Sequence, residues 1–117
     1  MIDIYSDLAS VGLPVCQQGT APEKLPKSFY TVWEDYSADN LNGDNAVKEI
    51  RHEWTLIYYT KDFATIYSGM QSAIDTLKAK GYIISGAGYD FNGTYGEWNA
   101  RAVDVKKIEK IGGQNNV

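Results

Sequence analysis

The sequence predicts an α+β fold, in which helices pack on one face of a sheet of about four strands. Two segments have the apolar spacing of amphipathic helices, and four segments are rich in β-branched and aromatic residues. Their order along the chain is helix, two strands, helix, two strands. We therefore expect two hairpins to form an antiparallel or mixed sheet, with the longer helix packed on one face.

Two segments are predicted to be helical. Residues 2–10 form a short helix in which Ile2, Tyr5, Leu8 and Ala9 lie at helical spacing, and Gly12 stands where a helix stops. The longer helix is capped by Asp62 and ends before Gly81. Its predicted apolar stripe comprises Phe63, Ile66, Tyr67, Met70, Ile74 and Leu77.

Four segments are predicted to be strands: residues 28–36, 47–60, 82–89 and 98–108. Residues 13–27 hold all three prolines and are predicted to be an extended surface loop. Residues 112–117 contain nothing to bury, so we expect a single domain over residues 1–111 followed by a flexible tail.

The dipeptide Asn42-Gly43 favours a tight type I′ turn between the first two strands. Such a turn places Glu34 opposite Arg51 on one face. On the other face, the candidate core, it predicts the pairs Phe29 with Leu56 and Thr31 with Trp54. The end of this hairpin, residues 34–44, carries four acids and no base, and is predicted to project from the body.

Composition excludes several classes of protein. The 117 residues carry 11 basic and 15 acidic side chains, a formal charge of −4, which disfavours tight nucleic-acid binding. No apolar run is long enough for a membrane span, and no basic signal-peptide start is present. With one cysteine and one histidine, neither a disulfide nor a zinc site is expected, and no cofactor is predicted.

Five residues or groups of residues have both a functional and a structural interpretation, and the structural interpretation is favoured for each. Residues 38–49 approach a calcium loop, but Ala38 replaces the first ligand, so a polar hairpin tip is expected. The glycines of residues 86–96 predict a bulged hairpin because no helix follows that would bind phosphate. His52 is predicted to be a partly exposed strand residue, and Cys16 an unreactive one.

The fifth group consists of four aromatic residues near the end of the chain. Tyr89, Phe91, Tyr95 and Trp98 resemble a platform for stacked bases, but only Arg101 supplies a nearby base. Packing in the core or at an interface is therefore expected. The 15 aromatic residues, nine of them tyrosines, exceed what a core of this size requires, and tyrosine is common at protein interfaces. The sequence predicts no catalytic, cofactor-binding or metal-binding residue, and hence no enzyme.

Several motifs occur in a familiar order. They are the opening MIDIYSDLASVGLPVCQQGTAPEKLPKSFYTVW, then ADN at residues 38–40, then a strand ending LIYYTKD before a helix. The sequence thereby resembles small tail-component proteins of tailed phages, and prophages, of Gram-positive bacteria. The matching stretches are residues 12–15, 19–26, 28–33, 38–40 and 56–62, so the resemblance covers the N-terminal half. None of these motifs is catalytic.

The resemblance implies a structural virion protein of the phage neck or tail. The expected function is a tail-completion, or tail-terminator, subunit with a fold similar to the lambda-type terminator. It would assemble in the cytoplasm of the host bacterium as a homo-oligomeric ring, a hexamer, that caps the tail tube and joins it to the head. Its partners would be the tail tube protein and the head–tail connector proteins, while DNA passes through without specific binding.

Two sets of residues are assigned roles on this basis. The acids Glu34, Asp35, Asp39 and Asp44 are expected to face the lumen or a partner, because like charge lets DNA slide past. The aromatics expected in the core or the interfaces are Phe29, Trp33, Trp54, Tyr58 and Trp98.

Two alternatives remain open from the sequence. One is a head-closure or connector protein of the same neck region, which defective particles would distinguish, because loss of a terminator gives tails of uncontrolled length. The other is a small acidic regulatory or binding protein, for which the charge and size are equally suitable.

Overall fold

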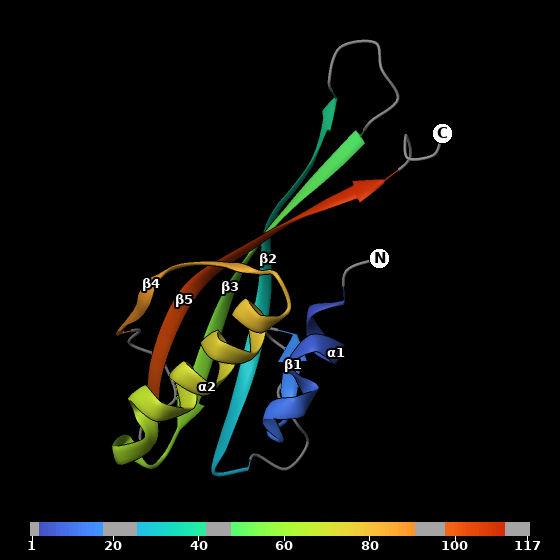
Figure 1. Ribbon diagram of the computed structural model, residues 1–117. Helices are drawn as coiled ribbons and strands as arrows, with labels where there is room; N and C mark the ends of the chain where they lie inside the picture. The colour runs from blue at the N-terminus through green and yellow to red at the C-terminus, as the bar shows by residue number, and fades with distance from the viewer. Residues whose placement is uncertain (1–2, 18–25, 42–47, 91–97, 112–117) are drawn as a thin grey trace.

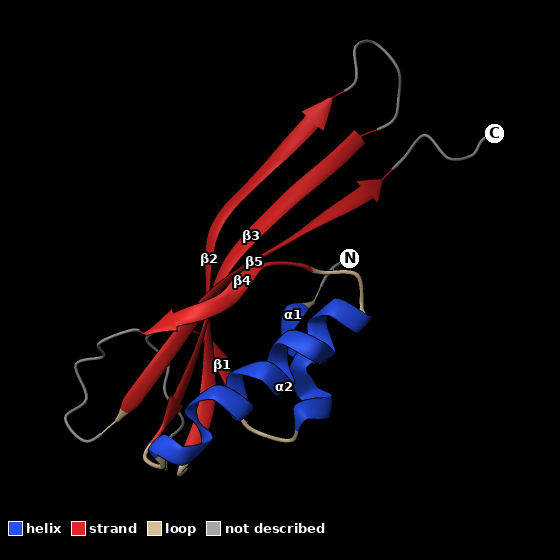
Figure 2. Ribbon diagram, turned by 60° about the vertical axis from the view of Figure 1, so that its left-hand side comes forward, coloured by secondary structure: helices blue, strands red, loops and turns tan. Residues whose placement is uncertain are grey.

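The computed structural model describes residues 3–17, 26–41, 48–90 and 98–111. A five-stranded mixed sheet, in the order β1-β2-β3-β5-β4, carries the helices on one face (Figure 1, Figure 2). Its strands are β1 (Val15–Gln17), β2 (Ser28–Leu41), β3 (Lys48–Thr60), β4 (Ile83–Asp90) and β5 (Asn99–Ile111). The helices are α1 (Ile4–Leu8) and α2 (Ile66–Ala79), with 3-10 turns η1 (Ala9–Val11) and η2 (Phe63–Thr65). The predicted α+β class is confirmed, and the sheet has one strand more than predicted. The predicted tail, residues 112–117, lies outside the described residues.

The additional strand, β1, lies in the segment that was predicted to be a surface loop. It pairs in parallel with β2, from Val15 opposite Tyr30 to Gln17 opposite Val32. The Tyr30 amide also donates a hydrogen bond to the Pro14 carbonyl, at 2.9 Å. Three residues are too few to show a period in the sequence, and Pro14 stands before the strand, where its missing N–H removes no ladder bond.

The predicted register of the first hairpin is wrong by three residues over the body of the sheet. Phe29 lies opposite Tyr59, Thr31 opposite Ile57, and Glu34 opposite Trp54. The error arises because β2 ends at Leu41 and β3 begins at Lys48, so the connection is longer than a two-residue turn.

An odd shift in register exchanges the faces of the paired residues, because side chains alternate along a strand. Trp54 therefore faces the helices, whereas Phe29 and Thr31 face the other side of the sheet. The predicted pairs Phe29 with Leu56 and Thr31 with Trp54 combined residues from the two faces.

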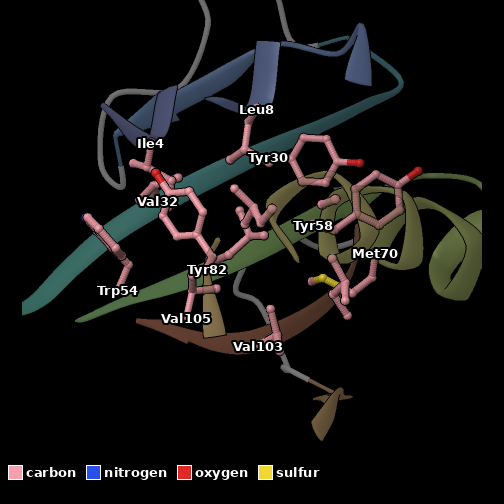
Figure 3. Packing of buried hydrophobic residues seen from close by; sticks show 14 of the residues in the cluster. Ile4, Leu8, Tyr30, Val32, Trp54, Tyr58, Met70, Tyr82, Val103 and Val105 are labelled. Atoms are coloured by element: carbon pink, nitrogen blue, oxygen red, sulfur yellow. The ribbon is translucent and has the colours of Figure 1, made fainter. Parts of the chain in front are cut away.

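The main core lies between the sheet and the helices (Figure 3). α1 contributes Ile4 and Leu8, while Tyr5, predicted to be on the apolar side, is 38% exposed. The helix starts at Ile4, two residues later than predicted, after the Asp3 cap, and its buried residues Ile4 and Leu8 lie four residues apart on the face toward the sheet. Gly12, with a φ of +92°, ends this segment as predicted. The other buried residues include Tyr30, Val32, Trp54, Tyr58, Tyr82, Val103 and Val105.

The predicted stripe of α2 is confirmed in its centre and wrong at its start. Ile66, Met70, Ala73, Ile74 and Leu77 are buried against the sheet. Phe63 and Tyr67, by contrast, are 62% and 58% exposed. Phe63 belongs to η2, a tighter 3-10 turn, so the α-helical period used for the prediction does not apply to it.

Two bulges interrupt the sheet. In β2 the register changes between Glu34 and Tyr36, and in β4 it changes between Ser85 and Tyr89. The second bulge contains Gly88, with a φ of +99°, and confirms the bulged strand predicted from the glycines.

Beyond the helices, β2, β3 and β5 continue as a three-stranded arm (Figure 1). The arm comprises residues 35–41 of β2, 48–53 of β3 and 107–111 of β5. It makes the molecule elongated, with extents of 53 × 26 × 24 Å. The predicted projection of the hairpin is present, and β5 adds a third strand to it.

Candidate interaction surface

The helices lie on one face of the sheet, and we call the opposite side the open face (Figure 2). Four large apolar side chains are exposed on it: Trp33 at 48%, Ile83 at 51%, Tyr89 at 46% and Ile108 at 43%. The pairing places Trp33 in one row with Thr55, Asp104 and Ser85, which fixes their common face. These four apolar residues form the open-face patch. Polar residues such as Thr55, Asp104 and Lys106 lie between them, so the open face combines exposed apolar and charged groups, as many protein–protein contact surfaces do.

Next to the patch, at the end of the open face away from the arm, lies a small buried cluster. Phe29 stacks on Tyr59 with ring centroids 5.2 Å apart, and Trp98 packs edge-on against Phe29 at 5.3 Å. Ile57, Ala100 and Ala102 complete the buried set. Two of the predicted aromatics, Phe29 and Trp98, thus stabilise the open face.

A shallow hollow of about 260 Å³ lies on the open face. None of the four patch residues lines it, but Lys106, the strand partner of Ile83, does. It is lined mainly by polar residues: Asp35, Glu53, Ser85, Asp104 and Lys106. Three carboxylates and one ammonium group make the hollow acidic. Its volume is below that of a typical small-molecule site, so it fits a single side chain better than a ligand.

The carboxylates of this hollow are held by residues of the same sheet. Thr55 Oγ1 donates to Asp35 Oδ2 at 2.6 Å, and the Tyr89 hydroxyl donates to Asp104 Oδ1 at 3.5 Å. Burial, followed by the charge of Asp104, raises the pKa of Tyr89. The Tyr89 hydroxyl therefore stays protonated as a donor, and the carboxylates keep defined positions.

On the helix side, at the base of the arm, His52 joins three strands. Its Nε2 lies 3.1 Å from Glu109 Oε1 of β5, and its Nδ1 lies 3.6 Å from Glu34 Oε2 of β2. The imidazole also stacks on Trp54, with centroids 5.5 Å apart. The hydrogen bond from His52 lowers the pKa of Glu109. The prediction of a partly exposed strand histidine is confirmed, and its neighbours supply no nucleophile.

The predicted acids do not act as one group. Glu34 and Asp35 are consecutive on β2 and point to opposite faces, one to His52 and the other to the hollow. Asp39 is placed only by its backbone, opposite Ile50 in the arm, and Asp44 lies outside the described residues. Side chains alternate between the two faces along a strand, so the sequence alone could have predicted that the consecutive residues Glu34 and Asp35 face opposite sides of the sheet.

The predicted aromatics divide between three environments. Trp54 and Tyr58 belong to the helix-side core (Figure 3). Phe29 and Trp98 belong to the cluster on the open face, and only Trp33 is largely exposed.

A second exposed surface was not found from the sequence. Phe63 and Tyr67 lie at the start of the α2 segment, at the end of the molecule away from the arm (Figure 1). The Arg101 guanidinium lies 4.7 Å from the centroid of the Tyr67 ring and is paired with Asp90 at 2.9 Å. We call Phe63 and Tyr67 the end patch.

The remaining sequence candidates give no reactive site. The segment 38–49 is flanked by strands, as predicted, and its residues 42–47 lie outside the described part. No cluster of three metal-ligating side chains occurs among the described residues. Burial raises the pKa of the Cys16 thiol, which disfavours the thiolate. In the aromatic platform, Phe91 and Tyr95 lie outside the described residues.

In comparisons with known proteins, the sequence matches no protein-family model and shows no significant similarity to a curated protein. In the described part of the chain, no helix has the length and apolar character needed to cross a membrane.

Proposed function

We propose that this chain is a structural protein of the phage neck, a tail-completion or tail-terminator subunit that forms a ring at the end of the tail tube. The observation that carries the proposal is the open face, which leaves Trp33, Ile83, Tyr89 and Ile108 exposed together. A subunit that functions within an assembly needs a face with exposed apolar and aromatic side chains that its neighbour can cover. The motif order described above supports a phage tail component in particular.

The arm is the second support for an assembly role. Three strands extend beyond the helices, and the acids Glu34 and Asp35 lie at the base of this extension. In a ring, the arm reaches the lumen or the adjoining neck protein. The acids of β2, rather than the basic residues of β3 and β5, are assigned to the side that faces the phosphate backbone, because like charge lets the genome pass without binding.

Solution mass is the first test of the proposal. Light scattering coupled to size exclusion, at several concentrations and with and without magnesium, should give a species of six times 13.0 kDa, about 78 kDa. Purified tail tubes incubated with the protein should carry the ring at one end in electron micrographs. A protein that stays monomeric and does not bind tail tubes would contradict the proposal.

A genetic test separates the terminator role from head closure. Loss of a terminator should give tails of uncontrolled length, whereas heads that leak DNA would indicate a head-closure protein. Changing Glu34, Asp35, Asp39 and Asp44 together to Asn or Gln should impair assembly or genome ejection. If particle assembly and genome ejection were unchanged in this variant, the role assigned to these four acids would be contradicted.

A further inference from the structure

A closed ring of more than two copies constrains its subunits, and the following inference rests on the ring proposed above. Contacts in such a ring are heterologous, so each subunit must present two different surfaces that fit each other. The open-face patch supplies one of them. The second surface must lie elsewhere on the same subunit and must also carry exposed apolar groups.

The end patch meets this requirement best. Outside the open-face patch, the large exposed apolar side chains of the described residues are Tyr5, Phe63 and Tyr67. Phe63 and Tyr67 are the two most exposed of all, at 62% and 58%, and they lie four residues apart on one short segment. Tyr5 stands alone on α1, at 38%.

The charges around the two patches are complementary. The hollow on the open face is lined by three carboxylates, those of Asp35, Glu53 and Asp104, and one ammonium group. Beside the end patch, Lys61 is exposed, and its ammonium group lies 5.0 Å from the centroid of the Trp98 ring. Arg101 lies against Tyr67 from the other side. The ammonium group of Lys61, which is two residues before Phe63 in the chain, is therefore opposite in charge to the acidic hollow of the open face.

We infer that the end patch of one copy packs on the open-face patch of the next, with Phe63 and Tyr67 on the apolar side chains and Lys61 facing the acidic hollow. The occupant of the open face is thus a second copy of this chain. The same contact, repeated from copy to copy, closes the ring.

Mixing two variants tests this pairing directly. Trp33→Glu disrupts the open-face patch, and the double variant Phe63→Glu/Tyr67→Glu disrupts the end patch. Each side chain is largely exposed, so both variants should fold, which far-ultraviolet circular dichroism checks. Each variant alone should be monomeric. An equimolar mixture should form a heterodimer of twice 13.0 kDa, about 26 kDa, because one intact pair of surfaces remains and chain growth stops there.

The matched control is Tyr5→Glu, which places the same charge at an exposed aromatic position outside both patches. It should assemble like the wild type. The charge component is tested by salt, because added salt screens the attraction of Lys61 to the hollow. Wild-type assembly should weaken as salt is raised, and Lys61→Met should lose most of this dependence.

The outcomes separate this inference from the proposed function. If the wild type forms rings but the mixture remains monomeric, or if either variant still forms rings, the pairing is overturned and the ring stands. If the wild type does not self-associate even on tail tubes, the pairing and the ring are both overturned.

Discussion

Gly69 of α2 leaves no room for a side chain beside the Tyr58 ring. A Cβ at position 69 would overlap that ring, which is 2% exposed and hydrogen-bonded through its hydroxyl to Thr65 at 3.0 Å. The Gly69 carbonyl also accepts from the Tyr30 hydroxyl at 2.7 Å. The absence of a side chain here lets α2 lie directly on two tyrosines of the sheet.

Gly69→Ala should therefore destabilise the protein by about 1–3 kcal/mol, the usual cost of overpacking. Helix propensity alone would give the opposite sign, because alanine favours a helix over glycine by about 1 kcal/mol. Urea unfolding measures the difference, with the exposed helix variant Ser72→Ala as a control near wild-type stability. A stabilised Gly69→Ala protein would mean that Tyr58 moves aside at no cost.

The pair formed by His52 and Glu109 predicts a pH dependence. The pKa of Glu109 is lowered by the His52 hydrogen bond, so the ionised carboxylate stabilises the fold. This contribution is complete above the ordinary carboxyl value of 4.5 and is lost as the pH falls through the lowered value of the folded state.

Glu109→Gln should remove that contribution. Unfolding free energies measured from pH 3 to pH 7 should then rise less steeply with pH than in the wild type. Glu53→Gln, on the other face of the sheet, keeps the pair and should keep its contribution. Equal slopes for wild type and Glu109→Gln would show that the pair does not stabilise the fold.

At the scale of elements, glycine in β4 allows the strand to stay in the sheet. Gly88 has a φ of +99°, and a Cβ there would lie 2.9 Å from the Ala102 carbonyl oxygen. Gly88→Ala should loosen the pairing of β4 with β5 and lower stability by about 1 kcal/mol or more. Amide hydrogen exchange should become faster in β4 and stay unchanged in β3. Uniform acceleration would instead indicate loss of global stability.

The elements differ in how well the sequence predicts them. The centre of α2 and the four longer strands follow from the local periods of their own residues. The register of β2 and β3 does not, because it depends on the length of the connection after Leu41. β1 forms because it pairs with β2, since its three residues carry little β propensity of their own.

The candidate surface was harder to predict than the fold. Trp33 was among the predicted aromatics, but its exposure depends on which face the helices cover. Phe63 and Tyr67 fit the helical stripe by spacing and are nevertheless exposed. Phe63 lies in the tight turn before α2, where the α-helical period does not apply. Tyr67 lies within α2 but at the edge of its buried face. The partners of His52 come from strands far apart in the chain, so only the register brings them together.

At the scale of the whole molecule, the arm and the body should differ in local stability. The body has a core on the helix side, whereas the helices do not reach the arm (Figure 2). Hydrogen exchange should therefore be slowest around Leu56 and Tyr58 and fastest in the arm segments of β2 and β5. Equal protection along β3 would indicate that the arm is stabilised by further contacts, such as those of an assembled ring.

The position of β5 between β3 and β4 has a consequence for synthesis on the ribosome. β4 pairs only with β5 in the described sheet, and β3 has β5 as its second neighbour. While the chain emerges, β4 is complete before β5, the strand that joins it to the sheet, exists. The core can close only after Val103 and Val105 leave the ribosome, so a nascent chain stalled before β5 exposes apolar surface and becomes a substrate for chaperones and proteases.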